Sequence, residues 1–260
     1  DCVYAQSSGA DANAAVLDEM VEALHSMGIQ VMQWHAESAP GQYEIATGHF
    51  EALEAADMCL LAREAISGVA RKHGLDVCFL PKYFHEQAGN GCHAHFSLWK
   101  DGVNIMATAP GPAPAPGSSK LSPGAPIATA QLSPEATAFL AGILAALPAL
   151  LPFTAASVNS YKRLAPSTWV GVHRAWGWDN RETPLRLTAP PAPRGVSPLE
   201  AVNAEYKPFD ATANPYLGLA ALVSAGLFGL LQQPALPEPL QVNPSSMSDE
   251  QLRAAGLERL

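Results

Sequence analysis

Charged residues, and basic ones above all, are scarce in this sequence. Only 15% of the 260 residues are charged, and 24 Asp and Glu outnumber 15 Lys and Arg, which gives a formal net charge of -9. No basic cluster is present to neutralise a phosphate backbone. We therefore expect no nucleic-acid partner.

Cysteine is also scarce. The four cysteines, Cys2, Cys59, Cys78 and Cys92, include no CxxC pair. This spacing argues against a zinc site and against a disulfide framework, and reduced thiols favour a cytoplasmic location. The N-terminus has no basic segment followed by an apolar one and no initiator methionine, so the chain is expected to be a piece of a longer protein.

Long uninterrupted apolar runs are missing as well, although 48% of the residues are hydrophobic. The longest candidate, "FLAGILAALPALLPF", contains Pro148 and Pro152, which are expected to break it. No membrane association is expected. A chain of this length can nevertheless bury a sizeable core.

Helical and strand-like patterns alternate along the chain. "SAPGQ" separates two strand-like segments and predicts a hairpin. Helices are predicted at 11–28 with Asp11 as a possible N-cap, at 51–73, at 133–151, at 214–231 after Asn214 and at 248–260 after Ser248; strands are predicted at 29–37, 43–50, 76–81 and 91–99, and loops with strands at 158–207. This order indicates an α+β fold with a largely antiparallel sheet.

From 107 to about 133 the composition changes to Pro, Ala, Ser and Gly, as in "APGPAPAPGSSKLSPGAP". Such a segment cannot build a packed core. It predicts a disordered surface insertion within a single domain rather than a domain boundary.

Two histidines stand two residues apart in "GCHAHFSLW". In a strand, His93, His95 and Ser97 share one face, because successive side chains alternate. This face is either a site or the solvated side of a half-buried strand, and spacing alone does not distinguish the two.

Two carboxylates flank the turn in "HAESAPGQYE". Glu37 and Glu44 lie on opposite arms of the hairpin and can converge, either around a cation or simply in solvent. Oxygen-rich clusters suit Mg²⁺ or Mn²⁺. His93 could add a nitrogen ligand and Glu205 a further oxygen.

Basic side chains are concentrated in "NSYKRL" and "WGWDNRETPLR", which contribute Lys162, Arg163, Arg181 and Arg186. Guanidinium groups bind planar carboxylates and phosphates bidentately, although surface ion pairs are the alternative. Acidic ligands, a histidine and arginines on separate segments suit phosphoryl transfer from a nucleotide. No Walker-type or GxGxxG motif is present, so the nucleotide site is expected to be of another kind.

The motifs "HAESAPGQYEIA", "GNGCHAHFSL", "NSYKRL", "NRETPLR" and "ANPYLGLAA" resemble, in order, the catalytic domain of the glutamine synthetase family. The stretch "TWVGVHRAWGWDNRETPLR" is similar to the FluG and nodulin-type branch. The resemblance implies a single catalytic domain over 1–260, incomplete at its N-terminus, with a curved antiparallel half-barrel and flanking helices.

The resemblance also implies an activity. ATP would phosphorylate the γ-carboxylate of glutamate, and ammonia would displace the phosphate, with two Mg²⁺ or Mn²⁺ ions, in a homo-oligomeric ring. By motif, Glu37 and Glu44 would bind one metal and His93 and Glu205 the other. The nucleotide would contact His95, Ser97 and Arg181, and glutamate would contact Gly89, Arg163, Arg186 and Lys207, with Arg163 and Arg181 in catalytic roles.

The sequence departs from the family pattern in several places. A strand with an E-x-E pair, which supplies one further ligand to each metal, would precede Asp1. The acidic residue that takes a proton from ammonium falls at Trp169, an arginine falls at Lys207 and an asparagine at Ala88. These changes leave two alternatives: a γ-glutamyl ligase for a bulkier amine, or a non-catalytic scaffold or signalling protein.

Overall fold

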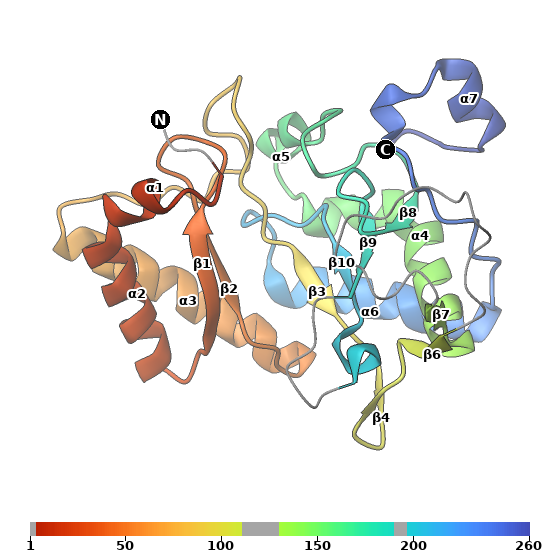
Figure 1. Ribbon diagram of the computed structural model, residues 1–260, viewed down its shortest axis with the longest axis horizontal. Coiled ribbons are helices and arrows are strands. Elements are labelled where there is room, and N and C mark those ends of the chain that lie inside the picture. The colour runs from red at the N-terminus through yellow and green to blue at the C-terminus, as the bar shows by residue number, and fades with distance from the viewer. Residues whose placement is uncertain (1–3, 111–129, 190–196) are drawn as a thin grey trace.

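The computed structural model describes residues 4–110, 130–189 and 197–260, and within them the hydrophobic core has two parts. In Figure 1 the elements up to α3 lie on one side and the remaining strands and helices on the other. The predicted α+β class is confirmed.

The N-terminal part is a hairpin packed on helices. It comprises α1 (Ser7–Asp11), α2 (Ala14–Ser26), β1 (Val31–Ala36), β2 (Tyr43–Thr47) and α3 (Ala52–Lys72). Leu17 and Met20 of α2 are buried against Val69 of α3, so the two helices share one core. The antiparallel β1–β2 pair confirms the predicted hairpin. The predicted cap was wrong: Asp11 ends α1, and Asn13 precedes α2.

The C-terminal part is built around a four-stranded sheet in the order β3-β10-β9-β8. Its elements are β3 (Ala94–Phe96), β4 (Trp99–Lys100), β5 (Val103–Asn104), β6 (Ala107–Pro110), β7 (Ala130–Leu132), α4 (Pro134–Thr154), α5 (Val158–Arg163), β8 (Trp176–Trp178), β9 (Leu185–Thr188), the 3₁₀ turns Pro198–Ala201 and Pro244–Ser246, β10 (Asn203–Tyr206), α6 (Pro215–Gln232) and α7 (Asp249–Ala254). β8 and β9 are parallel, while the other pairs of this sheet are antiparallel.

The strands of the described residues form one four-stranded sheet and three two-stranded pairs, and all pairings except β8–β9 are antiparallel, in line with the largely antiparallel arrangement that we expected. The strand predicted at 76–81 is absent, because the carbonyls of Cys78 and Leu80 accept hydrogen bonds from the Asn90 side chain instead of a neighbouring strand. In the region where loops and strands were expected, 158–163 forms α5, which begins with a capping box between Ser157 and Ser160.

The predicted insertion is ordered at its two ends. Residues 107–110 and 130–132 pair as β6 and β7, and the Ser133 side chain caps α4 through a bond from the Ala136 N–H. The prediction of disorder was therefore wrong for these ends, where strand pairing and burial of Met106 outweigh composition. The remainder, 111–129, lies outside the described residues.

The helices α4 and α6 form the centre of the larger core. The predicted helix is confirmed: α4 continues through Pro148, as expected, and also through Pro152 to Thr154, three residues beyond its predicted end at Leu151. Burial of Leu147, Leu150 and Leu151 compensates for the missing hydrogen bonds. Gly142 of α4 meets Gly229 of α6 so closely that a Cβ on either would collide with the other's backbone.

Both of these helices are long and apolar enough to cross a membrane by length and composition alone. In the most apolar window, 56% of α4 and 33% of α6 is buried inside the structure. Core helices pass the same test, so this observation is weak support for a membrane span.

Candidate active site

The buried carboxylate of Glu205 is the centre of the site. It lies on β10, opposite His95 of β3 and Arg186 of β9. Its Oε2 accepts a bond from Arg186 Nη1 at 2.9 Å, and its Oε1 lies 3.2 Å from Lys207 Nζ and 2.8 Å from His93 Nδ1. Burial opposes ionisation, but His93, His95 and Lys207 outweigh it and hold the pKa of Glu205 well below its usual range. Glu205 is therefore ionised.

His93 bridges Glu205 and Arg163. Its Nε2 lies 2.9 Å from Arg163 Nη2. Because a guanidinium only donates, Nε2 accepts this bond and Nδ1 carries the proton that is donated to Glu205. Burial lowers the pKa of His93 to about 4, so the ring is neutral at neutral pH. Both ring nitrogens are engaged by the protein, and binding of a metal by His93, as predicted, would require one of these bonds to open.

The hairpin holds a second cluster, consisting of His35, Glu37 and Glu44, with one possible ligand atom of each residue within 4.8 Å of the others. His35 faces Glu44 across the β1–β2 ladder, and its Nε2 lies 3.2 Å from Glu37 Oε1. We did not predict His35. Its spacing of two from Glu37 in a strand was the available signal, because such residues share a face.

The pKa of Glu44 in this hairpin cluster is raised, and Glu205 is among the charged groups that act on it. Loss of hydration raises the pKa of Glu44, and the carboxylates of Glu37 and Glu205 raise it further against the effect of His35. Carboxylates that repel one another in this way are stabilised by a cation. Two carboxylates and an imidazole suit Mg²⁺ or Mn²⁺, so the residues present fit a divalent ion.

Arg163 is buried beneath the loop that contains Gly89, and its exposed fraction is 2%. Its Nη2 also donates to the carbonyl of Lys207, whereas its buried Nη1 has no partner within the described residues. A Cβ on Gly89 would collide with the Pro81 carbonyl and lie 2.9 Å from Arg163 Cγ. The close approach explains the need for glycine there, and the same applies to Gly91, which we did not predict.

The three residues predicted to contact the nucleotide lie in different surroundings and do not form one cluster, unlike the residues around Glu205. His95 Nε2 lies 3.7 Å from Glu205 Oε1, and although burial opposes it, the Glu205 carboxylate raises the pKa of His95. Ser97 Oγ accepts a bond from Trp99 Nε1. Arg181 is exposed and lies over the Tyr4 ring at 5.9 Å, and within the described part of the chain no hydrogen bond or ion pair joins it to Glu205.

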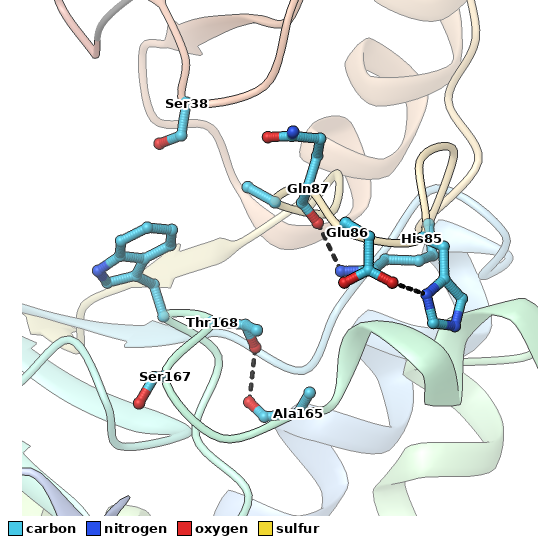
Figure 2. A pocket seen from close by; sticks show the side chains of 10 residues that line it. Ser38, His85, Glu86, Gln87, Ala165, Ser167 and Thr168 are labelled. Atoms are coloured by element: carbon cyan, nitrogen blue, oxygen red, sulfur yellow. Dashed lines mark hydrogen bonds and ion pairs between the residues drawn. The ribbon is translucent and has the colours of Figure 1, made fainter.

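A cavity of about 470 Å³ opens between the hairpin turn, the loop before β3 and the segment after α5. Figure 2 shows Ser38 across this cavity from Ser167 and Thr168, with the His85–Glu86 pair to one side. The lining residues are Ser38, Lys82, His85, Glu86, Gln87, Ala88, Ala165, Ser167, Thr168 and Trp169. Ala88 and Trp169, both departures from the expected pattern, therefore face the same space.

The loop that lines the cavity is fixed from two sides. Gln42 Nε2, in the hairpin turn, donates to the Gly89 carbonyl at 3.1 Å and to Asn90 Oδ1 at 2.6 Å. On the other side the Asn159 side chain of α5 exchanges hydrogen bonds with the backbone N–H and C=O of Lys82. The cavity wall is thus attached both to the hairpin and to α5.

Comparison with known proteins gives consistent matches. The family model "Glutamine synthetase, catalytic domain" matches residues 2–260. Gamma-glutamylpolyamine synthetase GlnA3 of Streptomyces coelicolor is 38% identical over 93% of the chain, and a glutamine synthetase of Methanocaldococcus jannaschii is 35% identical over 92%. The chain spans about half the length of these relatives, 48% of each.

Solved structures agree. A GmaS complex with ADP superimposes with a TM-score of 0.78 at 29% identity, covering 99% of this chain and 54% of that one. GmaS without ligand gives a TM-score of 0.74, also at 29% identity, over 95% of this chain and 52% of that one. None of these matches confirms the FluG and nodulin-type branch suggested by the sequence.

Proposed function

The chain belongs to the glutamine synthetase family, whose catalytic domain its residues 2–260 match, and from this premise we propose that the complete protein is an ATP-dependent ligase joining the γ-carboxyl of glutamate to an amine. The relatives are named as synthetases that make glutamine or γ-glutamylpolyamines. The sequence-based proposals of a cytoplasmic location and a homo-oligomeric ring accompany this activity.

The observation that carries the proposal is the hairpin cluster, in which one possible ligand atom of each of His35, Glu37 and Glu44 lies within 4.8 Å of the others. Loss of hydration raises the pKa of Glu44, and the charges of Glu37 and Glu205 act in the same direction. These residues would hold Mg²⁺ or Mn²⁺, which neutralises developing phosphate charge when bound. Glu37 is oriented for this task, because its Oε2 accepts bonds from the N–H and the hydroxyl of Ser38.

The basic residues support binding of glutamate. The Nη1 of Arg163 is a buried donor without a partner among the described residues, and such an unpaired donor is costly unless a substrate oxygen accepts its hydrogen bond. A carboxylate of glutamate suits this position, because guanidinium binds carboxylates strongly. Arg186 and Lys207 each form an ion pair with Glu205. To bind the substrate or the transferring phosphate instead, they would have to break these ion pairs.

The identity of the amine depends on the cavity. The indole of Trp169 cannot accept a proton from ammonium, and Trp169 lines a space of about 470 Å³ that ammonia does not need. We therefore favour an amine bulkier than ammonia as the second candidate substrate, a choice that also fits the name of the Streptomyces relative.

The test uses the full-length protein, whose gene is first read upstream of Asp1 for the E-x-E strand. Phosphate release from ATP is then measured with glutamate, Mg²⁺ or Mn²⁺, and a panel of ammonia, alkylamines and polyamines. We expect release that depends on glutamate and an amine and is lost in Arg163→Gln. Turnover with ammonia alone would refute the bulky amine, and no turnover with any amine would favour the non-catalytic scaffold.

A further inference from the structure

Two cysteines from distant parts of the chain lie in contact outside the ligand groups. Cys59 of α3 and Cys92, which precedes β3, have their sulfur atoms 3.9 Å apart. No disulfide links them, and each is partly buried. Sequence spacing gave no indication of this pair, because 33 residues separate its members.

The surroundings hold both sulfurs in place. The Cys92 backbone N–H donates to the Phe209 carbonyl at 2.9 Å. Arg63, one turn after Cys59 on α3, points its Nη2 at the Cys92 sulfur at 3.5 Å and donates from Nη1 to the Ala211 carbonyl at 3.1 Å. The guanidinium therefore ties the helix with Cys59 to the chain around Cys92.

We propose that Cys59 and Cys92 are a redox-active pair that closes to a reversible disulfide when the protein meets a hydroperoxide. One thiol sulfur attacks the O–O bond of hydrogen peroxide, becomes a sulfenic acid and releases water. The second sulfur attacks the first, the S–S bond forms, and the hydroxyl leaves as a second water. The two thiols lose two electrons and two protons, and the peroxide is reduced to water.

The movement that closure requires is small. The sulfurs must approach by about 2 Å to reach disulfide length, which rotation of two short side chains can supply. Cys78 provides the contrast, since its thiol is free and exposed and does not pair with another cysteine among the described residues. Because Cys92 directly precedes His93, closure would fasten α3 to the chain at the centre of the site.

The bond is detected directly in the full chain. After treatment with hydrogen peroxide, digestion without reductant and mass spectrometry should yield a cross-linked peptide pair containing Cys59 and Cys92, lighter than the two free peptides by two hydrogen atoms. Dithiothreitol should reverse it. The matched variant Cys78→Ser should keep the cross-link, and Cys59→Ser should lose it and leave Cys92 open to a sulfenic-acid probe.

Two results would overturn the proposal. One is oxidation of methionines elsewhere in the peroxide-treated protein without any Cys59–Cys92 link, which would show that peroxide reached the protein but did not oxidise this pair. The other is a link from Cys59 or Cys92 to Cys2 or Cys78 in at least equal yield. Both results are measured on the protein without substitutions, so poor folding of a variant does not affect the test of the proposal.

Discussion

Arg163 donates from Nη2 to Nε2 of His93 across 2.9 Å, and this bond fixes the tautomer of the imidazole. The proton is thereby placed on Nδ1, where it meets Glu205. A side chain suited to a carboxylate substrate and a predicted metal ligand are thus in direct contact. A metal ion that binds Nδ1 must move the proton of the ring to Nε2, which then no longer accepts the hydrogen bond from Arg163. Metal binding by His93 and the position of Arg163 are therefore coupled.

The first prediction concerns pH. Burial places the pKa of His93 at about 4, below the 6.5 of an unperturbed histidine. Between these values the unfolded chain binds a proton that the folded chain does not, so stability falls as pH decreases from about 6.5. We expect protonation of this histidine in the unfolded chain to lower the free energy of unfolding by about 2 kcal/mol at about pH 5, relative to neutral pH.

Urea unfolding of the metal-free protein at several pH values provides the measurement. The comparison is with His93→Asn, which should flatten the slope between about pH 6.5 and pH 5. His95→Asn is the matched variant, and because its pKa is raised it should not flatten this slope. An unchanged slope in His93→Asn would contradict the prediction.

A second prediction concerns the hairpin cluster. His35→Ala and Glu37→Gln should each weaken Mn²⁺ binding by at least about tenfold, because each removes one donor from the set. The measurement is titration of Mn²⁺ followed by electron paramagnetic resonance. His49→Ala serves as the control, since His49 stacks on Trp99 and is not part of the hairpin cluster found among the described residues. Equal losses in all three variants would remove the cluster from metal binding.

The third prediction concerns the contact between α4 and α6. Gly229→Ala should lower the free energy of unfolding by about 3 kcal/mol, because its methyl would collide with the Ala138 carbonyl and Gly142. Gly68→Ala in α3 is the control, since only the end of Arg71 lies near, at 4.0 Å. It should stabilise by about 0.5 kcal/mol. Similar effects of both, measured by denaturant unfolding, would contradict the close approach.

A fourth prediction addresses the amine. Trp169→Glu should raise kcat/KM for ammonia by about 100-fold relative to the preferred larger amine, because a carboxylate can accept the ammonium proton that the indole cannot. Trp169→Phe keeps an aromatic wall without a proton acceptor and should not gain ammonia use. The prediction is tested by steady-state phosphate release in the full-length protein, and equal gains in both variants would contradict it.

Local sequence patterns predicted the hairpin and the long helices, whereas the pairing of His93 with Glu205 was implied by the resemblance to the glutamine synthetase family. Alternation brought His93 and His95 to one face, and β10 pairs with β3 so that this face meets Glu205. The Glu37–Glu44 cluster also followed from pattern, because the turn between them forces the two arms together.

What failed depended on contacts between distant residues. The strand expected at 76–81 is missing because the Asn90 side chain donates to the carbonyls of Cys78 and Leu80, and α4 extends past its predicted end at Leu151 to Thr154. The contact of Arg163 with His93, a residue 70 positions away, was not predicted. No local period encodes such a pairing.

The bonds of Gln42 have a consequence for how the amine preference of this protein could diverge. The same side chain that closes the hairpin turn, between the carboxylates Glu37 and Glu44, also fixes the Gly89–Asn90 backbone at the end of the cavity loop. A substitution of Gln42, which does not line the cavity, would displace the cavity wall while leaving every lining residue unchanged. Homologues with identical linings can thus differ in the amine they accept, and comparison of lining residues alone would miss the cause.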